Sequence, residues 1–414
     1  MGRRRVAVVG GGVAGLTAAY VLRRTCDVTL FEADDRTGGH AHTHEVGGLR
    51  VDSGFIVHNT RTYPLLSRLL AELGVATQDC QMSMSVRCAG CGLQYAGGRG
   101  PLGLFGRPRS ALRAGYLRML AEVPRFYGAA RRVLADSGDD VTLSRFLADG
   151  GYSSYFIDHF TTPLVATVWS CAPAEAGRYP ARYLFAFLAN HGMLAVRGSP
   201  QWRTVKGGSR AYVERVEKEL TAVQTATPVL GLRRTETGVE VRDDADTTYR
   251  FDAAVIATHA DQALRLLSAP TPAERSVLGA FGYSRNETVL HTDASVLPSA
   301  RSVRASWNYL QPSCTEGGEQ VRVSYDMTRL QRLPGPTQYV VTLNGGGSIA
   351  PGRVLARMVY EHPIYTPQAL AAQRRLPELN VDRIAYAGAY HGWGFHEDGC
   401  RSGVAAARAL GGTW

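Results

Sequence analysis

The first forty residues contain a unit whose order of elements restricts the fold more than any other feature of the chain. A short apolar strand over residues 6–9 is followed by a glycine-rich turn, a helix over residues 16–22 and a second strand over residues 28–31. The turn has the spacing G-x-G-x-x-G, and the second strand ends at an acid. The positions concerned are Gly10, Gly12, Gly15 and Glu32. This order predicts a dinucleotide-binding βαβ unit.

Each position of this unit has a physical role. Gly10 allows the tight turn, Gly12 lets the backbone approach a pyrophosphate, and Gly15 lets the helix pack closely on the strand. The helix start offers free amides and a positive dipole end to the phosphates. Further cofactor contacts are expected there from Val13 and Ala14. The alternative is a glycine-rich turn in an ordinary α/β unit.

The acid at the end of the second strand narrows the choice of cofactor. Glu32 is expected to bind both ribose hydroxyls, and its carboxylate would repel the 2′-phosphate of NADP. A second glycine pair follows shortly after it, which a simple nicotinamide site does not need. The residues of this stretch predicted to contact the cofactor are Ala33, Gly38, Gly39 and His40.

Residues 32–40 resemble the fingerprint E-A-x-x-R-x-G-G-R of the amine-oxidase-like flavoproteins, which include monoamine oxidases, protoporphyrinogen oxidases and phytoene desaturases. His40 replaces the final Arg of that pattern. The resemblance implies FAD as the cofactor and an α/β fold. It implies a Rossmann-like FAD-binding domain of the glutathione-reductase type 2, with an inserted α+β substrate domain.

The C-terminus resembles a second segment of the same family, in which a strand ending in glycine precedes the last helix. Here the strand ends at Gly388, and Glu397 and Asp398 open the helix. The resemblance implies that amides at this helix start face the flavin O2 and N1, where the reduced ring carries negative charge. It also places three other segments near the cofactor, through Ser53, Gly54, Phe55, Val229 and Thr258.

The predicted domains are discontinuous. Apolar strands and a β-meander, followed by the terminal segment, assign residues 1–80, 204–270 and 380–414 to the FAD-binding domain. A mostly helical stretch over residues 81–203 and a β-rich stretch over residues 271–379 are assigned to the substrate domain.

Four polar residues are candidates for catalysis, because the resemblance places their segments near the isoalloxazine ring. A His can hold a proton near neutral pH, although any one of them can also be a hydrogen-bonded structural residue. His396 stands where amine oxidases have a Tyr of their aromatic cage, which makes simple amine oxidation less favoured. The candidates are His58, His291, Asp293 and His396.

Charge and cysteine content limit the other functions. The chain has 414 residues and a formal charge of +10, but no nucleic-acid recognition motif. The segment 99–132 combines many Arg with apolar residues, which predicts either an interfacial helix on anionic lipid or a solvated helix face. Cys88 and Cys91 form a single C-x-x-C without a visible partner pair, so a structural thiol pair and no metal are expected. We expect a cytoplasmic protein, soluble or peripheral on the membrane, since no stretch predicts a bilayer span.

A closer resemblance concerns a bacterial group of predicted NAD/FAD-binding proteins associated with cyclopropane, methyl-branched or furan fatty acid enzymes. It is carried by residues 51–59, 284–286, 290–293, 360–363 and 392–399. The resemblance implies an FAD-dependent desaturase that transfers a hydride from a lipid acyl chain to flavin N5. Two alternatives are a soluble oxidase of an amine or small molecule, and a non-catalytic lipid-binding protein on the same fold. The electron acceptor is open.

Overall fold

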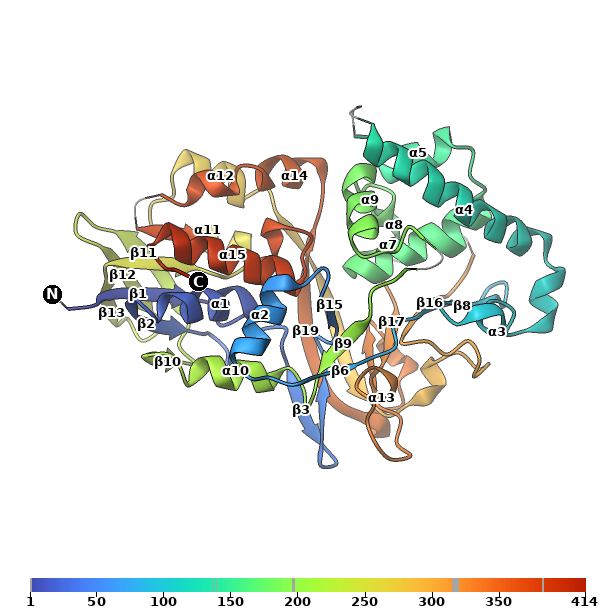
Figure 1. Cartoon of the computed structure of the whole chain (residues 1–414), viewed down its shortest axis with the longest axis horizontal. Coiled ribbons are helices and arrows are strands. Elements are labelled where there is room, and N and C mark those ends of the chain that lie inside the picture. The colour runs from blue at the N-terminus through green and yellow to red at the C-terminus, as the bar shows by residue number, and fades with distance from the viewer. Residues whose placement is uncertain (1, 137, 139, 196–197, 315–319, 382) are drawn as a thin grey trace.

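The computed structural model describes residues 2–136, 138, 140–195, 198–314, 320–381 and 383–414. Two lobes lie side by side in Figure 1, and the N- and C-terminal labels both lie on the lobe with the parallel sheet. None of the described helices combines the length and hydropathy needed to cross a bilayer.

A five-stranded parallel sheet forms the first lobe. Its strand order is β10-β2-β1-β14-β20. The strands are β1 (Arg4–Val9), β2 (Cys26–Phe31), β10 (Ala222–Gln224), β14 (Ala253–Ile256) and β20 (Ile384–Tyr386). The central strands are apolar because both faces are covered, which is typical of parallel sheets. Three distant parts of the chain therefore meet in one sheet, as the fold class predicts.

Two helices pack on each other beside this sheet with very little space between them. Helix α1 spans Val13–Leu22, and helix α15 spans His396–Ala409. A Cβ atom added at Gly403 would lie 2.4 Å from the carbonyl oxygen of Ala14, so only glycine fits there. Figure 1 shows these first and last helices side by side. The first and last helices of the chain are thus packed together near the start of α1.

An antiparallel meander covers the opposite face of the parallel sheet. It consists of β11 (Val229–Arg234), β12 (Val239–Asp243) and β13 (Thr248–Phe251), and the sequence predicted it. Phe31 of the parallel sheet contacts two of its rings edge-on, those of Tyr249 and Phe251. Further elements of this lobe are α2 (Pro64–Glu72), α10 (Arg210–Glu217), α11 (Ala260–Leu266), α12 (Pro272–Leu278) and α14 (Pro367–Gln373).

Two helices do not follow the predicted domain division. The segments that form α12 and α14 were assigned to the substrate domain, but both pack on the core of the parallel-sheet lobe. Val277 of α12 and Ala369 of α14 belong to the same buried cluster as Ile256. Their apolar faces need a partner, and the core of the parallel-sheet lobe supplies it.

A seven-stranded mixed sheet forms the floor of the second lobe, in the order β19-β15-β18-β17-β16-β7-β8. Neighbouring strands are antiparallel except for β16 and β7, which are parallel. The strands are β7 (Met84–Cys88), β8 (Gln94–Gly97), β15 (Gly282–His291), β16 (Trp307–Gln311), β17 (Val323–Asp326), β18 (Val340–Leu343) and β19 (Val354–Ile364). Both predicted halves of the substrate domain contribute strands.

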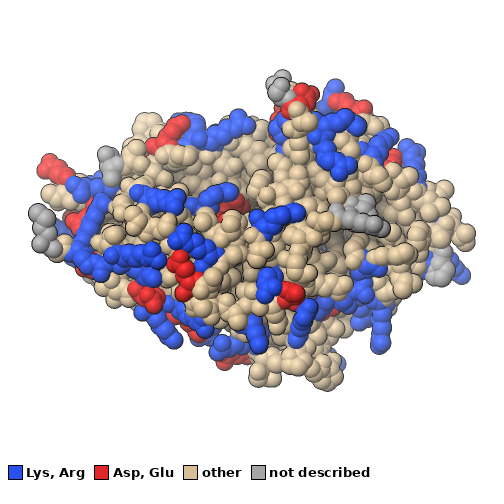
Figure 2. All heavy atoms as spheres, viewed as in Figure 1, with Lys and Arg blue, Asp and Glu red and all other residues tan. Residues whose placement is uncertain are grey.

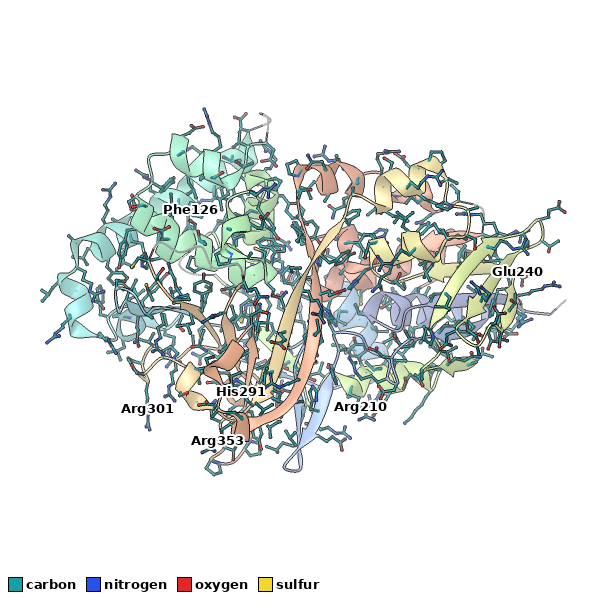
Figure 3. The ribbon with its side chains drawn as sticks, turned by 180° about the vertical axis from the view of Figure 1, so that it is seen from behind. Phe126, Arg210, Glu240, His291, Arg301 and Arg353 are labelled. Carbon is teal, nitrogen blue, oxygen red and sulfur yellow. The ribbon has the colours of Figure 1, made fainter. Side chains whose placement is uncertain are left out.

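Helices cover one side of this second lobe. They are α3 (Gly100–Leu104), α4 (Ala114–Ala135), α5 (Leu143–Asp149), α6 (Ser154–Phe156), α7 (Thr162–Trp169), α8 (Pro173–Ala176) and α9 (Ala181–Asn190). A π-helical turn, Ile157–Thr161, joins α6 to α7. Phe126 is the centre of their aromatic core and contacts rings of α5, α6 and α9, among them Phe185 at 5.5 Å (Figure 3).

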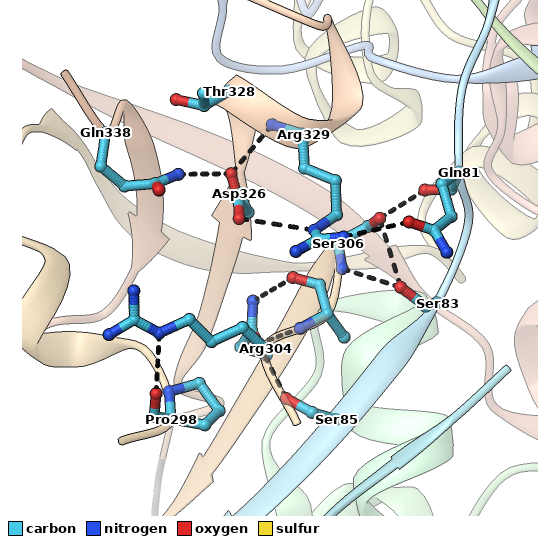
Figure 4. A network of polar contacts seen from close by, with 12 residues as sticks. Gln81, Ser83, Ser85, Pro298, Arg304, Ser306, Asp326, Thr328, Arg329 and Gln338 are labelled. Carbon is cyan, nitrogen blue, oxygen red and sulfur yellow. Dashed lines mark hydrogen bonds and ion pairs between the residues drawn. The ribbon is translucent and has the colours of Figure 1, made fainter. Parts of the chain in front are cut away.

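Short strands connect the two lobes. They are β3 (Thr43–Val46), β4 (Leu49–Asp52), β5 (His58–Asn59), β6 (Thr77–Asp79) and β9 (Trp202–Val205). A polar network then fixes the chain between β6 and β7 against the mixed sheet (Figure 4). The Ser306 amide donates to Ser83 Oγ at 3.0 Å, and Arg329 donates to Gln81 Oε1 at 3.0 Å. Helix α13 (Met327–Leu330) is capped in the same network by Asp326.

The positive charge of the chain is not gathered into one stripe on the face shown in Figure 2. Basic side chains lie over both lobes there, with acidic side chains among them. The face therefore has no continuous basic surface of the kind that follows a nucleic-acid backbone.

Candidate functional site

The glycine turn between β1 and α1 has the geometry that its spacing predicts. Gly10 has a φ of +104°, and a Cβ atom there would lie 2.8 Å from the carbonyl oxygen of Ala257. A Cβ atom at Gly15 would lie 1.9 Å from the carbonyl oxygen of Gly10. At Gly12, in contrast, a Cβ atom would meet nothing within 4 Å. Two glycines are needed for packing, and the third leaves open space in front of the helix.

That open space faces unpaired backbone donors. Gly12 is the N-cap residue of α1 and supplies no side-chain cap. The first-turn amides of a helix have no acceptor within the helix, so those of Val13 and Ala14 are available to a ligand. An anion is favoured at this position by the amides and by the helix dipole together.

Glu32 is held beside the turn by two backbone amides. Its carboxylate accepts from Gly11 N–H at 2.7 Å and from Asp34 N–H at 3.0 Å. Thr227 N–H donates to the backbone carbonyl of Glu32 at 2.9 Å, which brings the start of β11, Val229, close to this acid. Thr258 follows β14 and lies beside the glycine turn, because a Cβ atom at Gly10 would lie 3.2 Å from its amide nitrogen.

A second loop closes over the turn. Gly38 N–H donates to the carbonyl oxygen of Gly11 at 2.7 Å, and Gly39 has a φ of +55°. Ala33 is exposed at the start of this loop. Arg36 donates to the carbonyl oxygen of Gly39 at 3.0 Å and forms no ion pair with any described residue. Its charge is therefore available to a phosphate. The Arg of the E-A-x-x-R pattern corresponds to Arg36, so the sequence could have identified this residue as a cofactor contact.

The carboxylates at the start of α15 are used within the fold. Glu397 accepts from the amides of Leu65 and Leu66, both at 3.0 Å, and so caps α2. Asp398 accepts from the amides of Trp393 and Phe395, both at 3.0 Å. Both carboxylates are therefore occupied within the fold. If this pair contacts the cofactor as predicted, it does so through its backbone amides.

The loop before α15 is tied to that helix. Gly388 donates its N–H to Ser402 Oγ at 2.9 Å, and the same hydroxyl donates to the Gly388 carbonyl at 3.0 Å. This reciprocal pair fixes the end of β20 against the last helix. These two bonds link the two sides of the segment that we expect to face the flavin.

A cavity of about 820 Å³ begins where these segments meet and continues into the second lobe. His40, Ser53, Gly54 and Phe55 line it on the side of the glycine turn. Ser53 Oγ is hydrogen-bonded to the hydroxyl of Tyr360 at 2.6 Å. Most of the remaining wall is aromatic or aliphatic, including Met84, Tyr127, Phe160, Trp169, Trp307 and Trp393. No Asp, Glu, Lys or Arg is among the described residues that line this cavity.

Of the two predicted catalytic histidines near this cavity, His396 lines it and His58 does not. His396 stacks on Phe55 with ring centres 3.7 Å apart, and its Nε2 atom has no hydrogen-bond partner among the described residues. His58 lies behind them, with its ring centre 6.3 Å from that of Phe55. Burial, with a smaller contribution from His58, lowers the pKa of His396 to about 3. Burial followed by the charge of Arg203 lowers the pKa of His58 to about 4. Both rings are neutral at physiological pH.

The other two predicted catalytic residues do not reach the cavity, and the structure does not support their assignment. His291 is fully buried at the far end of β15, near Arg353 (Figure 3). Its two ring nitrogens are bonded to Thr342 Oγ1 and to the amide of Asp293. Asp293 accepts from the amides of Ser295 and Ala350, both at 3.0 Å. The long strand places this pair at the opposite end of the sheet from His396.

Histidines that the sequence did not single out line the cavity instead. His362 lies beside His40, with ring centres 5.3 Å apart, and burial lowers its pKa to about 4. Burial and the neighbouring His362 also lower the pKa of His40. His191 lies at the other side of the cavity and stacks on Trp202. Only the pairing of β15 with β19 brings His362 to this place.

Residues 13–347 match the family described as flavin containing amine oxidoreductase. The chain belongs to this family. It is a flavin-dependent oxidoreductase, and its cofactor is FAD. The open cradle at Gly12, the free amides of α1 and the unpaired Arg36 fit the diphosphate of that cofactor.

Among curated proteins, this flavoprotein is 30% identical over 288 residues to the coproporphyrinogen III oxidase of Mycobacterium leprae, which covers 66% of this chain and 63% of the relative. The chain therefore spans less than two thirds of that protein. It is 48% identical over 75 residues to protoporphyrinogen oxidase 2 of Arabidopsis thaliana, covering 17% of this chain and 14% of the relative.

Solved structures share the fold over nearly the whole chain. Putrescine oxidase bound to putrescine has a TM-score of 0.68 at 16% identity and covers 98% of both chains. A fatty acid isomerase from P. acnes that produces CLA has a TM-score of 0.66 at 16% identity, again over 98% of both chains. These likenesses confirm the predicted fold class of this flavoprotein.

Proposed function

We propose that this FAD enzyme oxidises an uncharged, largely apolar substrate, and that the substrate is a lipid acyl chain which it desaturates. The observation that carries the proposal is the absence of charged side chains among the described residues of the cavity wall. Burying an ion without a partner costs several kcal/mol, so such a wall favours a neutral ligand.

Two other substrate classes are disfavoured by the same wall. A protonated amine needs a carboxylate or a well-formed aromatic cage, and the cage position is occupied here by His396, which stacks on Phe55. A porphyrinogen carries carboxylate side chains, which bind best to Arg or Lys. The described lining residues offer neither cation.

Desaturation removes two hydrogens from neighbouring carbons, one as a hydride and the other as a proton. FAD, when bound, supplies the two-electron oxidation. The apolar wall excludes water and orients the chain. We propose that His396 receives the proton at Nε2, because this residue lines the cavity and that nitrogen has no hydrogen-bond partner among the described residues.

A segment that lines the cavity and also reaches the protein surface supports a lipid substrate. The Arg-rich segment 99–132 supplies Leu104 and Met119 to the cavity wall. Its outer surface carries three large exposed apolar side chains, Leu102, Leu112 and Leu117, of which Leu112 is 85% exposed. Apolar side chains among Arg residues are typical of a surface that lies on anionic lipid. We propose that this segment seats the enzyme on a membrane while an acyl chain enters.

Anaerobic reduction of the bound flavin tests the substrate class. The holoenzyme is mixed in separate experiments with phospholipid vesicles that carry unsaturated acyl chains, with a panel of amines and with coproporphyrinogen III. Of these three mixtures, we expect only the one with vesicles to lose the absorbance of the oxidised flavin. Mass spectrometry of the recovered lipid should then show a new double bond. Reduction by an amine or by the porphyrinogen, with none by lipid, would overturn the proposal.

A further inference from the structure

Four side chains from three distant parts of the second lobe form a compact cluster of sulfur and nitrogen atoms. They are Cys88 and Cys91, at the hairpin of β7 and β8, His159 of the π-helical turn, and Cys314 after β16. One ligand atom from each residue lies within 4.8 Å of every other. This cluster is separate from the dinucleotide turn, and none of its members lines the cavity.

Two separations within the cluster match those around a single tetrahedral ion, and the others lie within 4.8 Å. Cys88 Sγ and Cys314 Sγ are 3.6 Å apart, and Cys91 Sγ and His159 Nε2 are also 3.6 Å apart. Zinc bonds of about 2.3 Å to sulfur and about 2.0–2.1 Å to nitrogen place neighbouring ligands roughly 3.5–3.8 Å apart. All seven cysteines of the chain are free, and the 3.6 Å separation is much longer than a disulfide bond.

The surroundings orient each ligand. His159 Nδ1 is 3.1 Å from the carbonyl oxygen of Tyr155, and donation to it leaves the Nε2 lone pair directed at the sulfurs. A histidine ligand held by its second nitrogen is the usual arrangement in metal sites. The Tyr155 ring stacks on the imidazole at 4.1 Å and restrains its rotation.

The hairpin turn presents its two sulfurs in the same direction. The amide of Cys91 is hydrogen-bonded to the sulfur of Cys88, and the amide of Leu93 to the sulfur of Cys91. Gly92 N–H donates to the Cys88 carbonyl at 2.9 Å and takes a φ of +70°. Amide donors stabilise thiolates, which are the form of cysteine that binds a metal.

We propose that Cys88, Cys91, His159 and Cys314 bind one structural Zn²⁺ ion. Four protein ligands leave no open position, so the ion is structural rather than catalytic. It would join the hairpin, the π-helical turn and the loop after β16, which are neighbours only in the folded chain. Val86, Tyr95 and Phe160 lie within a few residues of the ligands and line the cavity, so the ion fixes that wall.

The test is the metal content of the full-length holoprotein, measured by plasma mass spectrometry together with its FAD content. We expect about one zinc per chain in the wild type. The variants Cys91→Ser, Cys314→Ser and His159→Gln should each lose zinc at least tenfold while they keep FAD. Cys80→Ala is the matched control, because Cys80 is also buried but lies outside the cluster. It should keep both zinc and FAD.

X-ray absorption of the wild-type protein keeps the test valid if a variant fails to fold. Three sulfur atoms at about 2.3 Å and one nitrogen at about 2.0 Å around zinc are expected. A wild type without zinc, a first shell of oxygen and nitrogen only, or a Cys88–Cys314 disulfide in the purified protein would overturn the proposal. Equal zinc content in Cys91→Ser and Cys80→Ala would do the same.

Discussion

The glycine turn and the cavity offer a ligand opposite kinds of surface. The glycine turn offers a ligand backbone amides, a helix end and one Arg without an ion pair among the described residues, and its own side chains are absent or small. In the cavity, the wall is made of large apolar side chains, and its described residues carry no charge. The first region therefore suits a charged group, and the second suits a neutral one.

The largest expected effect separates packing from binding within the glycine turn. Gly15→Ala places a methyl group against the Gly10 carbonyl, at 1.9 Å, and should destabilise the protein by more than about 3 kcal/mol. Gly12→Ala meets nothing within 4 Å and should change the stability of the apoprotein by less than about 0.5 kcal/mol. Urea unfolding of both apoproteins measures this difference.

The variant Gly12→Ala also tests where FAD binds. Gly12→Ala should weaken FAD binding at least about tenfold, because its methyl group fills the space where the backbone approaches the diphosphate. Equal FAD affinity of the wild type and Gly12→Ala would show that the diphosphate lies elsewhere.

A charge in the cavity should block the substrate but not the cofactor. Met84→Glu puts a carboxylate into the apolar wall, and kcat/KM for an acyl substrate should fall about 100-fold, which corresponds to about 3 kcal/mol. Met84→Leu is the control and should stay within a few-fold of the wild type. An unchanged kcat/KM in Met84→Glu, with FAD fully bound, would contradict the neutral-substrate proposal.

The exposed apolar residues of the two lobes should differ in their effect on membrane binding. Leu112→Asp is expected to reduce co-sedimentation with anionic vesicles several-fold at low salt, because it removes an apolar side chain that is 85% exposed. Leu230→Asp, on the meander, is 53% exposed and should leave binding unchanged. If the two variants sediment alike, the segment 99–132 is a solvated helix face.

A further expected effect, on the folded state rather than on binding, is the pH dependence of stability. The pKa of His396 is lowered from 6.5 to about 3, so the unfolded chain binds more protons than the folded one between these values. The free energy of unfolding should therefore decrease as the pH falls through this window, by up to about 1.4 kcal/mol per pH unit for this group. His396→Leu should lose less stability than the wild type between pH 6.5 and 4.5, measured by urea unfolding. Parallel curves for the two proteins would show that His396 is solvated in the folded state.

Local patterns were enough to predict the dinucleotide turn, because its chemistry depends on neighbouring residues. The roles of Gly10, Gly12, Gly15 and Glu32 follow from their spacing, and the meander follows from alternation and turns. The family follows from the same spacing, extended to the second glycine pair.

The cavity and the cysteine cluster required the tertiary structure, because they depend on residues far apart in the chain. His291 lies in a segment like those of the site, yet the length of β15 carries it to the opposite end of the sheet. The C-x-x-C at Cys88 lacks partners in the sequence, and the π-helical turn brings His159 to it. Sequence alone determined the shape of the glycine turn, which we expect to bind the charged half of FAD, since glycine conformation and helix ends are local. The fold alone decided which side chains meet beyond it, since burial and strand pairing are long-range.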